Sequence, residues 1–302
     1  MIVSEQNRKS DVATASQTDW DNCRFLTCSV LPVRMACNLD CPFCFSKSSV
    51  SVLRSEPANW ERLNVERYFE FSKEKGASRL VITGGGEPLL RANDVVSIVQ
   101  RGRKFFNEIA LFTNGTFMTR ELSRRLKDAG LSYLCYSRHH YDDVRCRQLM
   151  GNAAPDLTEF VDMADELPIR ATCVMAQGWI DTRELVDSYL SVLSAHGIRE
   201  FTFKHTYVAY EDSLFADASA NMWSKQHALN EDPFSDRGIV LTQLPWGPTI
   251  RQLNSLQVCY YFEPDPIWEL ENQLCRSVNL LSDGSVYASL ENQQSLLFQL
   301  TS

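Results

Sequence analysis

Three cysteines within eight residues are the strongest chemical feature of the sequence. Cys37, Cys41 and Cys44 have the spacing C-x3-C-x2-C and follow an apolar run. Cysteine sulfur favours zinc or an iron–sulfur cluster over magnesium or calcium. Structural zinc takes four closed ligands, and no fourth ligand lies near this loop. A four-iron cube held by three cysteines instead keeps one iron open for a small chelating molecule. The spacing therefore favours a cluster, with a zinc site or simple loop packing as the alternative.

The loop resembles the signature of the radical S-adenosylmethionine (SAM) enzymes, including Phe43 directly before the third cysteine. The resemblance implies that Cys37, Cys41 and Cys44 hold one [4Fe-4S] cluster, whose open iron binds the amino and carboxylate groups of SAM. It also implies that one electron, from a donor such as flavodoxin or ferredoxin, cleaves SAM to methionine and a 5′-deoxyadenosyl radical. Phe43 is implied to lie near the adenine.

Length and composition restrict the class of protein. The 302 residues, 44% of them hydrophobic, suffice for one large α/β domain with a small appendage or for two modest domains. The net charge of −8 argues against a nucleic-acid partner and favours a neutral or cationic substrate. No signal-peptide core and no apolar run of membrane-spanning length is present, so we expect a cytoplasmic protein without a membrane partner. Ten cysteines then indicate free thiols and metal ligands.

Helical and strand-like segments alternate along the first two thirds of the chain. Strands are expected at 24–34, 79–83, 109–113, 131–137, 169–175 and 200–205, and helices at 60–75, 93–106, 119–129, 156–167 and 181–196. Such alternation favours parallel pairing through right-handed crossovers. It predicts a partial (β/α)6 barrel of the TIM type with a small C-terminal α+β extension, which the resemblance also implies.

We expect three regions: a flexible lead-in over 1–22, the barrel over 23–206, and a lid with a hairpin over 207–302. Barrel enzymes carry their chemistry at the C-terminal ends of the strands, so polar residues at those ends are the candidate site.

Three strand ends carry candidate SAM contacts. Gly85, Gly86 and Glu87 follow the second strand, without a Walker A or dinucleotide pattern. They resemble the Gly-Gly-Glu-Pro motif of the family, which implies that they hold the SAM amino group; a plain turn is the alternative. Thr113, in the sequence Thr-Asn-Gly after the third strand, resembles an element that faces SAM from beneath, or forms a tight turn. Ser137 after the fourth strand is implied to contact the ribose or carboxylate.

Other polar residues at strand ends are candidate substrate contacts. His139 and His140 are adjacent, so an extended segment points them to opposite sides, and either could contact substrate or remain a solvated loop histidine. Lys204 and His205 also lie on opposite faces of the sixth strand, so we expect one of them to point inward. We favour His205, because Lys204 shares its parity with the surface charge Glu200.

The C-terminal region contains Cys259, Cys275 and an Asp283-Gly284 pair that predicts a hairpin turn. The hairpin is similar to the small "twitch" hairpin of several radical SAM enzymes, where cysteines bind a second cluster. Ser289 stands where that hairpin has its closing cysteine, and two thiolates are too few for a second cluster. Cys259 is then a candidate hydrogen-atom donor, as in epimerases of the family, with a buried packing cysteine as the alternative.

The sequence therefore predicts a radical SAM enzyme that abstracts a hydrogen atom from a small molecule of a specialised biosynthetic pathway, with epimerisation or dehydrogenation as the outcome. Only 36 residues precede Cys37, so we expect no N-terminal peptide-recognition domain. A maturase acting on a ribosomally made peptide is the second hypothesis. A zinc-stabilised binding protein without enzymatic activity is the third.

Overall fold

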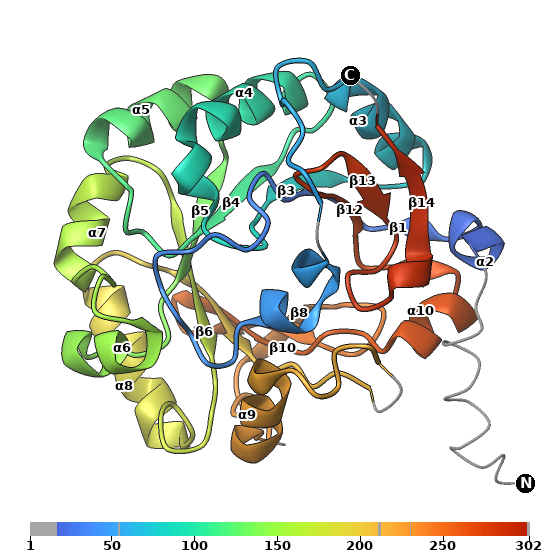
Figure 1. Cartoon of the computed structure of the whole chain (residues 1–302). Helices are drawn as coiled ribbons and strands as arrows, with labels where there is room; N and C mark the ends of the chain where they lie inside the picture. Colours follow the sequence, from blue (N-terminus) through green and yellow to red (C-terminus); the bar gives the residue numbers. More distant parts are fainter. Residues whose placement is uncertain (1–16, 54, 211–212, 230, 301–302) are drawn as a thin grey trace, which may run out of the picture.

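One large curved sheet organises the part of the chain that this computed structural model describes, namely residues 17–53, 55–210, 213–229 and 231–300. The strand order is β14-β13-β12-β2-β3-β4-β5-β6-β7-β10-β9-β8. The strands from β12 through β10 run parallel, and the remaining pairings are antiparallel. Figure 1 shows helices α3, α4, α5, α7 and α8 outside the curved sheet. No pairing joins the two ends of the described sheet, so the barrel is open.

The six expected barrel strands are all present. They are β2 (Thr27–Val30), β3 (Arg79–Ile82), β4 (Ile109–Thr113), β5 (Tyr133–Ser137), β6 (Ile169–Val174) and β7 (Glu200–Lys204). The expected helices are α3 (Val65–Glu74), α4 (Ala92–Gly102), α5 (Arg120–Ala129), α7 (Leu157–Ala164) and α8 (Arg183–Ala195). The helix α6 (Asp143–Met150) and the short 3-10 helices η1 (Phe45–Ser48), η2 (Val50–Val52) and η3 (Pro88–Arg91) lie in the connections. No helix in the described ranges is long and apolar enough to cross a membrane.

The two faces of the sheet differ in polarity. Alternate residues of each strand, such as Leu80 and Phe203, are fully buried against the outer helices. Phe203, for example, packs 5.3 Å from the ring of Tyr189 in α8. The intervening residues point to the inner face and are largely polar, as in the ion pair between Arg170 of β6 and Glu200 of β7 at 2.6 Å. The outer face therefore supplies the apolar core, and the inner face is left for polar chemistry.

The C-terminal region extends this sheet at both edges. It contains β8 (Ile239–Gln243), β9 (Thr249–Leu253), β10 (Leu256–Tyr261), β11 (Leu274–Cys275), β12 (Val278–Leu280), β13 (Ser285–Tyr287) and β14 (Leu296–Gln299), with α9 (Ser219–His227), α10 (Pro266–Glu271) and η4 (Gln293–Ser295). β10 pairs in parallel with β7, and β12 pairs in parallel with β2. The predicted hairpin is present as the antiparallel pair β12–β13. The region thus extends the barrel sheet at both edges, as a C-terminal α+β extension continuous with it.

The flexible lead-in expected over residues 1–22 is not found in residues 17–22, which the structure describes. Residues 17–21 form helix α2 (Gln17–Asp21), and Trp20 is fully buried in the main core, so this part is no loose lead-in. Residues 1–16 of the expected lead-in lie outside the described residues. The strand expected at 24–34 is divided into β1 (Arg24–Phe25) and β2, because β1 pairs with β11 in a separate small sheet.

A single buried hydroxyl joins the first barrel strand to the C-terminal region. The Tyr68 hydroxyl lies 2.6 Å from the carbonyl oxygen of Ser29 in β2 and 2.7 Å from that of Val278 in β12, so its one O–H can donate to either, and it accepts from the Ser29 amide at 3.2 Å. Tyr68→Phe should lower the free energy of unfolding by about 1–3 kcal/mol, because it leaves buried backbone groups without this partner. Urea denaturation measures the change, with Tyr141→Phe as the control. Equal midpoints for Tyr68→Phe and the wild type would contradict the prediction.

Candidate functional site

The three cysteines lie in the loop that leaves the C-terminal end of β2 and, in blue in Figure 1, crosses the open centre of the sheet. Cys37 is exposed, whereas Cys41 and Cys44 are half-buried. The loop is held on one side by α6, since the Asp40 amide donates to the carbonyl of Met150 at 2.9 Å. The Cys44 amide also donates to the Cys41 carbonyl at 3.3 Å, which closes a turn between the two thiols.

The glycine loop after β3 lies directly against the backbone that precedes Cys37. The Gly85 amide donates to the Val33 carbonyl at 2.9 Å. A Cβ atom on Gly85 would lie 1.7 Å from the Arg34 carbonyl oxygen, and one on Gly86 would lie 1.8 Å from that of Ala36. No side chain fits at either position. The glycines therefore set the path of the cysteine loop, and their predicted contact with SAM stays a prediction.

Glu87 connects the glycine loop to the end of β4. This buried carboxyl accepts hydrogen bonds from the Thr113 hydroxyl at 2.8 Å, the Asn114 amide at 2.8 Å and the Leu89 amide at 3.0 Å. Burial raises the pKa of Glu87, and these hydrogen bonds oppose the rise. Thr113, predicted as a SAM contact, thus uses its hydroxyl to hold Glu87.

Asn114 belongs to the Thr-Asn-Gly segment that the sequence predicts as an element facing SAM or as a tight turn. Its Nδ2 donates to the Asn38 side chain at 3.1 Å and lies 3.7 Å from the Cys37 sulfur. Its Oδ1 accepts from the amide and hydroxyl of Thr116, which orients the side chain. Asn114 therefore binds the cysteine loop from the end of β4.

Phe43 lies in an aromatic cluster over the inner face. Its ring is 4.7 Å from that of His139 and 5.6 Å from that of Trp223 in α9. Nδ1 of His139 accepts from the Val174 amide at 2.9 Å. Burial lowers the pKa of His139 to about 3, so this ring is neutral at physiological pH. Helix α9 thus packs against the cysteine loop through Trp223.

Lys204, not His205, reaches the inner network at the end of β7. Phe201 and Phe203 share the parity of His205 and pack outward on Tyr189 of α8, so the preference for His205 is not supported. The Lys204 ammonium contacts Glu263 at 2.9 Å and lies 5.1 Å from the Tyr261 ring centroid. The choice between Lys204 and His205 could not be made from the sequence, because the alternation of side chains along a strand does not reveal which of its two covered faces points into the barrel.

A buried network of charged groups surrounds Glu263. Besides Lys204, Glu263 binds the Tyr261 hydroxyl at 2.9 Å and the Arg276 guanidinium. Burial alone would raise the pKa of Glu263, but the positive charges of Arg276 and Lys204 outweigh burial and lower it to about 2. The Arg276 guanidinium also contacts Glu291 at 2.8 Å and lies 5.4 Å from the ring centroid of Phe45, the residue after Cys44. The network therefore extends from β7 to the cysteine loop.

The two C-terminal cysteines lie in different sheets. Cys259 is in β10 and pairs with Thr202, whereas Cys275 is in β11, where its thiol contacts Cys23. The Ser289 hydroxyl donates to Glu291 at 2.7 Å. Within the described residues, Cys259 and Cys275 thus lie apart and in different sheets.

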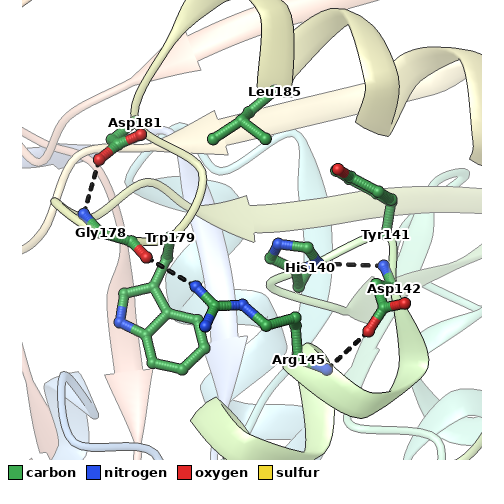
Figure 2. Close-up of a pocket in the computed structure, with 8 residues that line it drawn as sticks. All are labelled: His140, Tyr141, Asp142, Arg145, Gly178, Trp179, Asp181 and Leu185. Carbon is green, nitrogen blue, oxygen red and sulfur yellow. Dashed lines mark hydrogen bonds between the residues drawn. The ribbon is translucent and has the colours of Figure 1, made fainter.

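A surface pocket lies between the loops that follow β5 and β6 (Figure 2). Arg145 lies over the Trp179 ring at 4.5 Å and donates to the Gly178 carbonyl at 2.8 Å. His140 lines this pocket, and its Nδ1 accepts from the Asp142 amide at 3.0 Å. The two predicted histidines are thus separated, with His139 against Phe43 and His140 buried in the wall of the pocket.

The donor set fits a cluster better than a single ion. Among the residues described, no three His, Cys, Asp or Glu side chains converge closely enough to hold one metal ion. The three thiols are nevertheless close enough to interact: burial raises the pKa of Cys41, and the charges of Cys44 and Cys37 raise it further. A four-iron cube spreads its ligands more widely than one ion does, and three soft thiolates on an open side suit it.

The fold and this site define a parallel α/β barrel-type protein with a three-cysteine cluster loop. Residues 32–181 match the family model described as the Radical SAM superfamily. The chain belongs to the radical SAM superfamily through these residues. Its family cofactors are a [4Fe-4S] cluster and SAM.

Curated relatives match about half of the chain or less. GTP 3′,8-cyclase of Aquifex aeolicus is 30% identical over 157 residues, which cover 50% of this chain and 48% of the relative. AdoMet-dependent heme synthase of Methanosarcina barkeri is 34% identical over 101 residues, which cover 33% of this chain and 28% of the relative. The chain thus spans about half the length or less of the curated relatives it matches.

Among solved structures, Streptococcus suis SuiB bound to precursor peptide SuiA has the same fold. Its TM-score is 0.55 at 15% identity, over 95% of this chain and 64% of SuiB. This likeness confirms the partial TIM barrel architecture predicted above and carries no information about the substrate.

The contact between Asn114 and Cys37 should help to retain the cluster. Asn114→Ala should lose iron to a chelator about 10-fold faster than the wild type, because groups that orient metal ligands typically contribute 10–100-fold to metal affinity. Anaerobic reconstitution followed by visible absorbance during chelation measures the rate. Asn152→Ala, at an exposed position nearby, is the matched control. Iron loss at the wild-type rate in Asn114→Ala would remove this role.

The Glu263 network should make stability depend on acid pH. Because the folded-state pKa of about 2 is below the unfolded value of about 4.3, ionised Glu263 stabilises the protein above about pH 4.3. This contribution is lost as pH falls toward 2. Glu263→Gln should therefore be less stable at pH 7 by on the order of 3 kcal/mol, and the difference should shrink toward pH 2.5. Urea denaturation at both pH values tests this, with exposed Glu159→Gln as the control. A difference that is independent of pH would contradict it.

Proposed function

We propose that this protein is a radical SAM enzyme that abstracts a hydrogen atom from a small molecule of a specialised biosynthetic pathway, with epimerisation or dehydrogenation as the outcome. The observation that carries the proposal is the three-cysteine loop, held by the glycine loop, Glu87 and Asn114 over a polar inner face. When bound, the cluster and SAM supply a carbon-centred radical, given one electron from a donor such as flavodoxin or ferredoxin.

We propose three roles for the residues of this site: holding the cluster, contacting SAM and contacting the substrate. Cys37, Cys41 and Cys44 would hold the cluster, while Gly85, Gly86, Glu87, Phe43, Thr113 and Ser137 would contact or support SAM. Thr113 would do so through Glu87, and Phe43 from its place between His139 and Trp223. On the substrate side stand Lys204 and Cys259.

Cys259 is suited to return a hydrogen atom to a substrate carbon. Its register with Thr202 places it on the inner face, and burial raises the pKa of the thiol to about 11, so the S–H bond is intact at neutral pH. In this step the S–H bond breaks and a C–H bond forms, which leaves a sulfur radical. One electron from the external donor and one proton from solvent restore the thiol. Such a return would make the reaction an epimerisation.

A peptide substrate is the second candidate. SuiB is described with a bound precursor peptide, but its likeness to this chain is one of fold. We favour the small molecule, because Lys204 and Cys259 lie on the inner face of the barrel.

The cluster assignment predicts about four irons per chain after anaerobic reconstitution. With dithionite and SAM, the wild type should form 5′-deoxyadenosine, and Cys37→Ala should lose at least a hundredfold of this activity together with its visible absorbance. Cys173→Ala, at a fully buried cysteine on the outer face, is the control. A colourless wild type without SAM cleavage would refute the proposed function.

The donor role of Cys259 predicts an exchangeable hydrogen in the product. In D2O, with SAM, dithionite and a small-molecule extract of the host, the wild type should give a product that carries one deuterium at carbon. Cys259→Ala and Cys259→Ser should still form 5′-deoxyadenosine but not this labelled product. Mass spectrometry measures both. Unchanged labelling in the variants would exclude Cys259 as the donor.

A further inference from the structure

Four small polar side chains form one row across the inner face of the sheet. Ser137 pairs with Thr172, Thr172 with Thr202, and Thr202 with Cys259, on the neighbouring strands β5, β6, β7 and β10. Paired residues of parallel strands point to the same face, about 4.8 Å apart. Their neighbours along the strands are buried in the helix-facing core: Tyr136, Ala171, Cys173, Phe201, Phe203, Val258 and Tyr260. The row therefore faces the inside, with the Cys259 thiol at one end.

The Thr172 hydroxyl in this row has no hydrogen-bond partner within the described part of the chain, although Thr172 is only 4% exposed. Buried hydroxyls are normally paired, because leaving one unpaired destabilises the folded protein. A valine would fill the same space without this cost. An unpaired hydroxyl on the inner face is therefore expected where a ligand supplies the missing partner.

Lys204 lies directly above the row. It follows Thr202 by two residues in β7, so both side chains point to the same face, and it pairs with Tyr261 of β10. Its side chain is 29% exposed, and Glu263 is its one hydrogen-bond partner among the described residues. An ammonium group has three N–H donors. Lys204 can therefore donate to a ligand that also reaches the row.

The charges around Lys204 balance without a ligand. Lys204 and Arg276 face Glu263 and Glu291, which gives two positive and two negative groups. Burial, with the charge of Glu291, raises the pKa of Glu269 well above the usual value, which favours the neutral form of this carboxyl. In the layer below, Arg170 is paired with Glu200. An anionic ligand would meet no excess positive charge here. An uncharged hydroxyl group of a ligand, in contrast, can accept a hydrogen bond from Lys204 and donate one to Thr172.

We infer that Thr172, Thr202 and Lys204 bind a neutral substrate that carries several hydroxyl groups, a sugar or polyol, with its reacting carbon next to Cys259. This inference rests on the proposed function and names the substrate class for that site. A carbon that bears a hydroxyl group is a favourable place for hydrogen-atom abstraction, because the adjacent oxygen stabilises the carbon radical. Return of hydrogen from the thiol to such a carbon would invert a secondary alcohol.

Binding of simple probes to the cluster-loaded protein tests the inference without turnover. Saturation-transfer NMR should detect myo-inositol and methyl α-D-glucoside, and it should show weaker binding of gluconate, which carries a carboxylate. Thr172→Val and Lys204→Met should each weaken binding of the neutral probes at least fivefold, and Thr172→Ser should restore it. Thr158→Val, which removes an exposed hydroxyl on α7, should leave binding unchanged.

Stability provides a second readout that a purely structural hydroxyl would not give. Thr172→Val should raise the midpoint of urea denaturation, or leave it unchanged, while it weakens probe binding. Wild-type binding in Thr172→Val and Lys204→Met, tighter binding of gluconate, or no binding of either neutral probe would each overturn the inference. Formation of 5′-deoxyadenosine by the same preparation separates the two proposals. If SAM is cleaved and the probes do not bind, only the substrate class fails; if the probes bind and SAM is not cleaved, the proposed function fails.

Discussion

Close backbone contact between the glycine loop and residues 33–36 is the constraint on which the site depends. The parallel ladder of β2 and β3 continues past the end of both strands, from the Thr83 amide to the Glu87 amide, which donates to the Ala36 carbonyl at 2.9 Å. This continuation is possible only because Gly85 and Gly86 present no side chain to the facing carbonyls. It carries the chain to Cys37 in a fixed position. The sheet therefore determines where the first thiol lies, and Asn114 then meets it from the end of β4.

The outer face of the sheet supplies most of the stability of the fold, and the inner face carries the polar groups. Outward-facing residues pack against helices and supply most of the apolar burial, so the inner face is free to hold ion pairs and hydroxyls. Buried charges destabilise a fold unless each is paired. Glu263 meets this condition with three partners, namely Lys204, Arg276 and Tyr261. Among the described residues, the Thr172 hydroxyl is one of a few buried side-chain groups without a partner, and it lies on this inner face.

Local signals in the sequence predicted the helices and the barrel strands. They did not predict the contacts between segments that are far apart along the chain. Helix α5, for example, ends where Gly130 adopts a left-handed conformation with φ of 104°, and glycine at such a position is a local signal of a helix end. The cysteine spacing likewise identified the cluster loop without any structure. The pairings of β10 with β7 and β12 with β2 have no local signature, because strand partners far apart in sequence leave no periodic trace. Trp20 was missed for a similar reason: its partners in the core are distant along the chain.

The match to the family identifies the cofactors and does not identify the substrate, because it covers only part of the residues that face the inside of the barrel. The family match ends at residue 181, and it includes the cysteine loop, the glycine loop and Asn114. Lys204, Cys259, Glu263 and Arg276 all lie after it, in β7, in β10 and in the segments that follow. These residues are brought to the inner face by the C-terminal extension of the sheet. The segment that matches the family therefore contains the predicted cluster and SAM residues, whereas the residues for which a substrate role is proposed lie after it. If those proposals hold, specificity depends on β7 and β10, because the cofactor residues lie in the segment that this chain shares with the family.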